Sequence, residues 1–194
     1  MKLHYMGKYN LDPDSIPTKP HRPNAVPFKE PEDSTALSKI ANSIAVIVWI
    51  IFCIPVFVIH GFDAIPLWFL GTLLSLLTYF PHEFLHAICC KEDVYLYTNW
   101  QQGMLFVVAP EDMSKFRFVF MSLLPTIVFG VIPYIVFCFN PAWIWLGSFA
   151  ATCISSGGGD FINIFNALTQ MPKGALTYLY KFNSYWYIPE KENK

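Results

Sequence analysis

Residues 65–88 read IPLWFLGTLLSLLTYFPHEFLHAI, an apolar run that ends in two histidines and a glutamate. As a helix, the run is long enough to cross a hydrocarbon core of about 30 Å. Ionisable groups inside a membrane helix are unfavourable by about 2.5–3.5 kcal/mol each, so three of them together require a functional reason. Pro81 removes one helical hydrogen bond and predicts a bend just before His82. The stretch therefore predicts a membrane helix that carries a polar site.

The histidines and the glutamate have the spacing of a metal site. His82 and His86 are four residues apart, so both imidazoles lie on one helical face and can bind one Zn²⁺ at about 2.0–2.1 Å. Glu83 lies about 100° around the helix, where it can accept a proton from water instead of binding the metal. The pattern is the HExxH motif that is typical of zinc metalloproteases. The alternative is a chance match, at roughly one in a few hundred for this composition.

The composition is that of a membrane protein. The 194 residues are 54% hydrophobic and 14% charged, whereas roughly 25% charged residues are usual in soluble domains. The length suits one domain, and the net charge of -1 gives no reason to expect a nucleic-acid partner. The five cysteines are odd in number and lie in or beside apolar segments, so we expect them to pack as small apolar residues.

Four apolar stretches predict four transmembrane helices. They lie at about 40–59, 65–88, 116–139 and 142–168. Pro125, Gly130 and Pro133 interrupt the third stretch, and residues 157–160 interrupt the fourth.

One substantial polar connection, residues 91–115, joins the second and third spans. It contains two β-prone runs, 94–97 and 104–108, around a polar segment at 98–103, which predicts a β-hairpin. The expected fold is therefore an all-α membrane protein with about four transmembrane helices and a small cytoplasmic hairpin between the second and third.

The ends of the chain differ from this core. Residues 1–37 are polar and carry six prolines, which favours an extended, solvated arm. The alternative is that the arm packs on the domain through Leu3, Tyr5, Tyr9 and Leu11. Residues 171–194 combine four lysines with an aromatic cluster, so we expect a tail along the membrane interface. The predicted division is an arm at 1–37, a four-span core at 38–170 and a tail at 171–194.

The basic residues predict the orientation. Lysines and arginines gather in the arm, in the connection at 91–115 and in the tail, whereas the turns at 60–64 and 140–141 have none. Four spans place the three basic segments on one side, which the positive-inside rule makes the cytoplasm. We expect a multi-pass protein of the cell membrane with both termini cytoplasmic and membrane lipid as its surroundings.

A catalytic zinc site usually has three protein ligands, so the two histidines need one more. Asp160 is the only charged residue in the fourth span, and residue counting places His82 and Asp160 at nearly equal depths of roughly 26 and 27 Å. Asp160 could instead cap a helix that restarts after three glycines. The other candidate ligands are in the connection: Glu92, Asp93 and Asp112.

Two asparagines follow Asp160 within two helical turns. Asn163 and Asn166 could support the ligand or an oxyanion, and the alternative for both is hydrogen bonding within the bundle.

Several short elements together resemble a known family. They are HEFLHA at 82–87, SGGGD at 156–160, GKYN at 7–10, PKG at 172–174 and SYW at 184–186. They resemble the bacterial "putative zincin peptidase" membrane family, which is regarded as a relative of the site-two intramembrane proteases. The resemblance implies that His82, His86 and Asp160 bind zinc and that Glu83 is the general base. Site-two proteases usually have Asp followed by Gly, often after Asn-Pro, whereas here Phe161 follows Asp160.

The function expected from these features is zinc-dependent hydrolysis of peptide bonds near the cytoplasmic leaflet. The substrate would be a membrane protein or peptide, which residues 94–108 could hold in an extended form as an added strand. Residues 157–159 could supply flexibility for its entry. A di-iron enzyme would need more histidines than the spans contain. The remaining alternative is a catalytically inactive membrane scaffold or transport subunit that keeps a zinc site.

Overall fold

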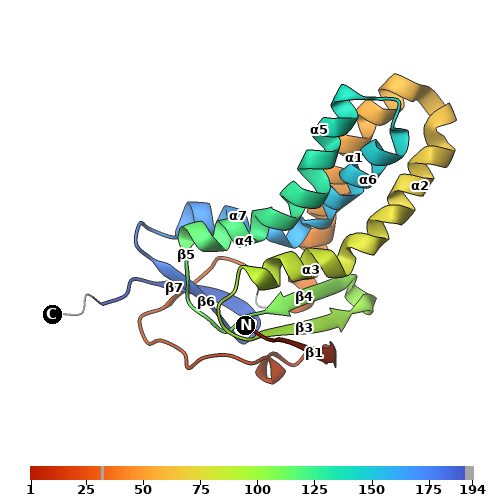
Figure 1. Cartoon of the computed structure of the whole chain (residues 1–194). Coiled ribbons are helices and arrows are strands. Elements are labelled where there is room, and N and C mark those ends of the chain that lie inside the picture. Colours follow the sequence, from red (N-terminus) through yellow and green to blue (C-terminus); the bar gives the residue numbers. More distant parts are fainter. Residues whose placement is uncertain (32, 191–194) are drawn as a thin grey trace.

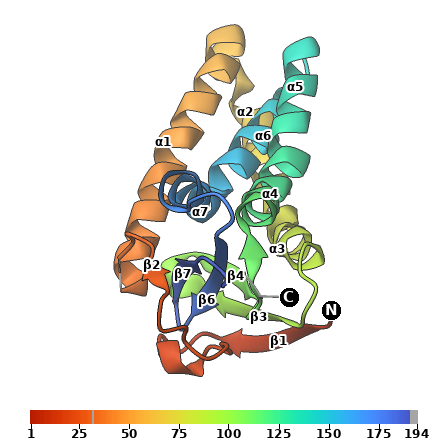
Figure 2. The ribbon, with the colours of Figure 1, turned by 90° about the vertical axis from the view of Figure 1, so that its left-hand side faces the viewer.

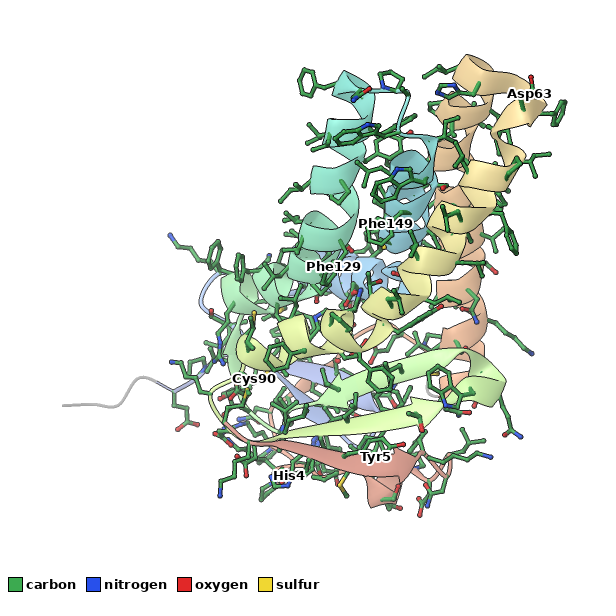
Figure 3. All side chains as sticks on the ribbon, turned by 45° about the vertical axis from the view of Figure 1, so that its right-hand side comes forward. His4, Tyr5, Asp63, Cys90, Phe129 and Phe149 are labelled. Carbon is green, nitrogen blue, oxygen red and sulfur yellow. The ribbon has the colours of Figure 1, made fainter. Side chains whose placement is uncertain are left out.

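The computed structural model describes residues 1–31 and 33–190. A bundle of helices forms one end of the molecule, and further helices turn away from the bundle axis and lie over two small sheets (Figure 1). The bundle contains α1 (Ser34–His60), α2 (Ile65–Ser75), α5 (Ile132–Phe139) and α6 (Ile144–Ser156). The turned helices are α3 (Tyr79–Ile88), α4 (Lys115–Pro125) and α7 (Gly158–Gln170). Asp63 lies at the outer end of the bundle, and His4 and Tyr5 lie at the opposite end (Figure 3).

The first predicted span, 40–59, lies within α1, but each of the other three is divided. A 3-10 turn at Leu76–Thr78 separates α2 from α3, a π-helical segment at Thr126–Val131 separates α4 from α5, and Gly157 separates α6 from α7. The bend was expected just before His82, but the helix is interrupted earlier, at the 3-10 turn Leu76–Thr78. Pro81 lies in the first turn of α3, where its missing N–H would have no helical acceptor in any case.

The apolar surface agrees with a membrane location by length and composition. Helical segments Ser34–Ile88 and Lys115–Phe139 are long and apolar enough to cross a membrane. Only 11% of the most apolar window of the first segment is buried within the protein, so most of its side chains are at least partly exposed. All five cysteines are free; Cys53, Cys90 and Cys153 are buried, as expected for small apolar residues, whereas Cys138 is exposed.

The second and fourth predicted spans pack against each other through small residues. A Cβ at Gly71 of α2 would collide with the backbone of Trp145 and the side chain of Ser148, both on α6. Lower along the same contact, Thr78 Oγ1 lies 3.5 Å from Cys153 Sγ. Small side chains allow the two backbones to approach closely, which is a common way for membrane helices to pack.

The hairpin between α3 and α4 forms as expected. Strand β3 (Val94–Asn99) pairs antiparallel with β4 (Met104–Val108), and Gly103 has the positive φ of 64° that the turn requires. The arm adds β1 (Leu3–Lys8), which pairs in parallel with β3. The sheet order is β1-β3-β4, so β4 has one edge that no strand covers among the described residues.

The structure also contains a second sheet, which the expectation of an all-α protein with one small hairpin did not include. Its order is β2-β7-β6-β5, and it joins distant segments of the chain. The strands are β2 (Val26–Pro27), β5 (Met113–Ser114), β6 (Leu176–Tyr180) and β7 (Asn183–Tyr187). The predicted tail thus contains a β6–β7 hairpin that its aromatic composition did not reveal, and residues 191–194 of that tail lie outside the described part of the chain.

The N-terminal arm packs on both sheets, in agreement with the alternative to a solvated arm. Tyr9, Ile16 and Phe28 are buried, and Tyr9 stacks on Phe182 with ring centroids 5.8 Å apart. Leu3, Tyr5 and Leu11 remain exposed, so Tyr9 is the one of the four expected residues that is buried. Figure 2 shows β1 at one side of the sheet layer and β2 at the other, with the arm running between them.

Candidate metal centre

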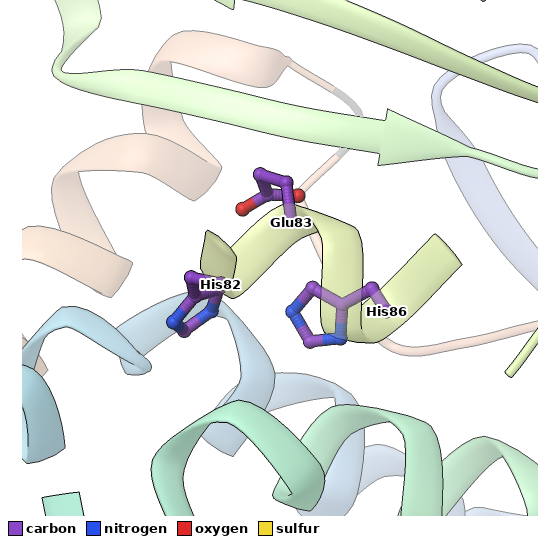
Figure 4. Close-up of side chains that lie close together, drawn as sticks. All are labelled: His82, Glu83 and His86. Atoms are coloured by element: carbon purple, nitrogen blue, oxygen red, sulfur yellow. The ribbon is translucent and has the colours of Figure 1, made fainter. Parts of the chain in front are cut away.

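Helix α3 is amphipathic, and this places its polar residues inside the protein. His82, Glu83 and His86 are 8%, 9% and 6% exposed, whereas Phe80 and Phe84 on the other face are 55% and 52% exposed. The ligand atoms of His82, Glu83 and His86 lie within 4.8 Å of one another. Figure 4 shows that the Glu83 side chain points toward a neighbouring strand, while the two imidazoles point to the other side of α3.

Asp160 lies in the first turn of α7 and reaches both histidines. Its Oδ2 is 3.2 Å from His82 Nε2, and its Oδ1 is 3.3 Å from His86 Nε2. Helix α7 is held close to α1, since a Cβ at Gly158 would collide with the carbonyl oxygen of Ala41. The break at Gly157 and this close contact bring Asp160 to a helix that lies 78 residues earlier in the chain.

The hydrogen bonding of His86 indicates what the three side chains can bind. His86 Nδ1 lies 2.9 Å from the carbonyl oxygen of Met121 on α4, and a carbonyl can only accept, so Nδ1 carries the proton. In the neutral ring, Nε2 then presents a lone pair toward the Asp160 carboxylate. Two acceptors facing each other need a proton or a metal ion between them. A ring fixed through its other nitrogen is the usual arrangement around a metal ligand.

The donor set fits Zn²⁺. Two imidazole nitrogens and a carboxylate are common zinc ligands, and ligands at 2.0–2.1 Å in a tetrahedron are separated by about 3.3 Å. The distances from Asp160 to His82 and His86, which run from its two different oxygens, are 3.2 and 3.3 Å and so are close to this separation. His82, His86 and Asp160 could therefore hold one zinc ion and leave the fourth position to water or substrate.

Glu83 is anchored to the sheet. Its Oε2 accepts a hydrogen bond from the backbone N–H of Val107 on β4, with an N–O distance of 3.0 Å. In the antiparallel ladder Val107 lies opposite Leu96, and its N–H points away from β3 toward α3. One oxygen of the carboxylate is thus held by β4, and the side chain is fixed beside the histidines.

A cavity of about 320 Å³ opens beside this group. His82, Glu83, His86 and Asp160 form part of its wall, and strand β4 borders it along its whole length. The N-terminal arm and the β6–β7 hairpin add further wall residues, which include Ile16, Glu30, Tyr178 and Phe182, and helices α1 and α4 contribute others. A cavity of this volume is within the range of ligand-binding sites in proteins.

The other candidate ligands have partners elsewhere. Glu92 pairs with Lys19 at 2.6 Å, Asp93 with His4 at 3.0 Å and Asp112 with Arg22 at 2.7 Å. All three pairs tie the connection to the N-terminal arm, so the structure does not bring these carboxylates to His82 and His86.

The two asparagines differ in position. Asn163 lines the cavity next to Asp160. Asn166 donates to Glu30 at 3.4 Å and accepts from Gln170 at 2.8 Å, so it connects α7 to the arm. For Asn166, this contact agrees with the alternative that the asparagine makes structural hydrogen bonds.

Sequence reasoning missed a buried ion pair that fixes the end of α3. The Arg117 guanidinium contacts the Glu111 carboxylate and donates to the carbonyl oxygen of Cys89, which follows α3, at 2.7 and 3.0 Å. Glu111, which is 4% exposed, also accepts from the backbone N–H groups of Lys91 and Glu92. These residues belong to no recognisable motif, and only the hairpin between them brings them together.

Comparison with known proteins gives one match. No curated protein and no solved structure matches this chain. A family model described as "putative zincin peptidase" matches residues 75–176, which include the helix with His82 and His86, the hairpin and Asp160. Because this match covers just over half of the 194 residues, the chain belongs to the family of "putative zincin peptidase" proteins.

Proposed function

We propose that this protein is a zinc-dependent peptidase that hydrolyses peptide bonds at the cytoplasmic boundary of the cell membrane. The observation that carries the proposal is the contact of Asp160 with both His82 and His86, at 3.2 and 3.3 Å, beside a separately held Glu83. Membership of a family described as zincin peptidases supports the chemical class.

His82, His86 and Asp160 would hold the metal, and Met121 would fix the ring of His86 through its carbonyl oxygen. Zinc, when bound, polarises a substrate carbonyl and lowers the pKa of a water toward 7.

Glu83 would be the general base. It accepts the proton of the attacking water and then returns it to the nitrogen of the leaving amine, so the carboxylate ends the cycle as it began. The N–H of Val107 holds one carboxylate oxygen, Oε2, and thereby orients the other for proton transfer.

The depth of the site supports a boundary location. Gly158, two residues before Asp160, contacts α1 at Ala41 and Ala45, which is about 22–28 Å from the His60 end of that helix at 1.5 Å per residue. With a hydrocarbon core of about 30 Å, the metal ligands would lie near the inner edge of the core. The sheets would lie beyond that edge, in water.

The proposed orientation places the sheets in the cytoplasm. The turns at the outer end of the bundle have no lysine or arginine, whereas the arm and the connection around the sheets carry most of them. The positive-inside rule then gives cytoplasmic termini and four crossings. Helix α1 is long enough to cross alone, whereas α2, α5 and α6 have 11, 8 and 13 residues, so the turned helices α3, α4 and α7 would complete the other three crossings at the boundary.

The substrate would bind as an extended segment along β4. The outer edge of β4 borders the cavity, and no strand pairs with it among the described residues. An unpaired edge is a template for a further strand, which would hold a peptide extended beside Glu83. The expected substrate is a membrane protein or a membrane-bound peptide.

The test combines zinc content with peptidase activity of the detergent-purified chain. We expect about one zinc per chain in the wild type and in Glu83→Gln, and loss of zinc in His82→Ala and Asp160→Ala. Glu83→Gln should lower peptide hydrolysis about 100-fold or more, because it removes the base and keeps the ligands.

The outcomes separate the proposal from its rival. Zinc with no loss of activity in Glu83→Gln would contradict the assigned base. Zinc binding without any hydrolysis of peptide libraries by the wild type would support a zinc-containing scaffold instead, and absence of zinc after metal-replete purification would overturn both.

A further inference from the structure

We infer that Glu30 in the N-terminal arm binds a cationic group of the substrate, and this inference rests on the proposed function. Glu30 lies in the wall of the same cavity as His82, Glu83 and Asp160. It comes from a segment that sequence reasoning assigned to a solvated arm, and it lies outside the family match at 75–176.

The contacts of Glu30 leave its charge without a cationic partner. Its Oε1 accepts from the backbone N–H of Ser184 at 2.7 Å and from Asn183 Nδ2 at 3.4 Å. Its Oε2 accepts only from Asn166 Nδ2, also at 3.4 Å. All three donors are neutral, two of them are at the limit of a hydrogen bond, and a carboxylate offers about four acceptor positions. Capacity therefore remains for a further donor.

The rest of the cavity does not supply a cation. None of the described lining residues is a lysine or an arginine. Of the other carboxylates, Glu83 and Asp160 belong to the metal centre, and Glu111 is paired with Arg117. Glu30 is thus a carboxylate in the cavity wall, outside the metal centre, that no cation of the described residues neutralises. A lysine, an arginine or an amino terminus of a bound peptide would complete it.

The position of Glu30 indicates how far the cationic group of the substrate lies from the scissile bond. Asn166, which contacts Glu30, follows Asp160 by six residues on α7, a rise of about 9 Å. An extended peptide advances about 3.3 Å per residue. This rise corresponds to about three residues of extended peptide, so we expect the cationic group at about this distance from the cleaved bond.

The expected site of cleavage supplies such groups. Membrane spans are flanked on their cytoplasmic side by lysine and arginine. A peptidase at the inner boundary with an acidic contact about three residues from its metal would select the point where a span ends and its basic flank begins.

The inference is tested by peptide binding to the full-length Glu83→Gln variant, which should bind without cleaving. The probes are short uncharged peptides with an acetylated amino terminus, a fluorescent label at the carboxyl end and either one lysine or one acetyl-lysine at each position in turn. Fluorescence anisotropy should show about tenfold tighter binding of the lysine peptide at one or two positions.

Matched variants test whether Glu30 causes the preference for the lysine peptide. The preference should disappear when Glu30→Gln is added to Glu83→Gln, and it should persist when Glu190→Gln, an exposed control, is added instead. Glu30→Asp keeps the charge on a shorter side chain and should keep part of the preference. It provides a second test of the role of the charge if the Gln variant does not fold.

A further set of probes distinguishes the two sources of the cation. These peptides contain acetyl-lysine and a free amino terminus. If they alone bind more tightly than their acetylated forms, the group is the α-amino group; if only the lysine peptides do, it is the side chain. In either case Glu30→Gln should remove the difference.

Equal binding of all the peptides, or a preference that survives Glu30→Gln, would overturn the inference. Neither result depends on turnover. Hydrolysis by the wild type without a charge preference would reject Glu30 alone, whereas a charge preference without hydrolysis would reject the proposed function and keep Glu30 as a peptide contact.

Discussion

At the scale of single residues, hydrogen bonds to backbone groups fix the side chains of the candidate centre. His86 is fixed by the carbonyl oxygen of Met121, and Glu83 by the N–H of Val107. Both partners are backbone groups. Any residue type can supply a backbone group, so the sequence does not reveal these partners. Backbone contacts of this kind restrict rotation of the functional groups and keep them ready for a metal and for proton transfer.

Glu30 gives a prediction about stability and pH. Burial, more than any other effect, raises the pKa of this carboxyl above its ordinary value of 4.5, and its hydrogen bonds only partly oppose that rise. A carboxyl whose pKa is higher in the folded than in the unfolded chain destabilises the fold once it ionises. We therefore expect Glu30→Gln to melt at a higher temperature than the wild type at pH 7.

The same reasoning fixes the range of pH over which the difference disappears. The advantage of Glu30→Gln should decrease as the pH falls through the raised pKa and vanish below pH 4.5, where both states of the wild type are protonated. Melting curves of the purified proteins across this range would measure it. A variant that is less stable than the wild type at pH 7 would show that the hydrogen bonds of Glu30 outweigh its burial.

At the scale of elements, the glycines between α6 and α7 have different roles. Gly158 touches the backbone of Ala41 on α1, and a Cβ at Gly157 would lie 2.6 Å from Thr126 Oγ1, whereas a Cβ at Gly159 would meet nothing within 4 Å. Close packing therefore accounts for two of the three glycines. The flexibility for substrate entry that their sequence suggested stays a prediction.

This difference provides a matched pair of variants. Gly158→Ala should lower the free energy of unfolding by about 1–3 kcal/mol and reduce zinc affinity, because α7 must move away from α1 and carries Asp160 with it. Gly159→Ala should be neutral or stabilise the helix by up to about 1 kcal/mol. Melting temperature and zinc titration measure both variants, and equal effects of the two would contradict the packing argument.

The edge of β4 can be tested in the same way. Leu105 and Val107 have the same orientation in the ladder with β3, so the N–H of Leu105 also points away from β3. Leu105→Pro removes that donor from the proposed substrate edge and keeps the pairing with β3, since proline is tolerated at strand edges. We expect about a tenfold loss of peptide hydrolysis with zinc retained.

Leu105→Ala is the control for this variant, because it shortens the side chain and leaves the donor in place. Peptide hydrolysis and zinc content should be measured for both. Unchanged hydrolysis in Leu105→Pro would reject the addition of the substrate as a strand on β4.

At the scale of the whole molecule, the cavity is made by segments from both ends of the chain. The N-terminal arm and the β6–β7 hairpin add residues to its wall, and both lie on the side of the turned helices away from the bundle (Figure 2). The aromatic contact between Tyr9 and Phe182 links these two ends. The arm is therefore part of the candidate site, although its proline-rich sequence is typical of a solvated segment.

The sequence by itself determined the features that depend on local geometry. Helical periodicity places His82 and His86 on one face, hydropathy predicts the apolar helices, and two β-prone runs around Gly103 predict the hairpin. Each of these follows from the spacing of neighbouring residues. The contact between Asp160 and the histidines was also anticipated, because Asp160 is the only charged residue in the fourth span and residue counting placed it at nearly the depth of His82.

Only the tertiary structure decided where the helices bend, that β1 pairs with β3, and that Glu30 reaches the cavity. These features depend on contacts between residues far apart in the sequence, such as Glu30 with Ser184 and Arg117 with Cys89. Such contacts arise when packing brings the segments together, and a local pattern does not encode the partner. The chemistry of the centre was therefore readable from its motif, whereas the cavity that would select a substrate required the whole fold.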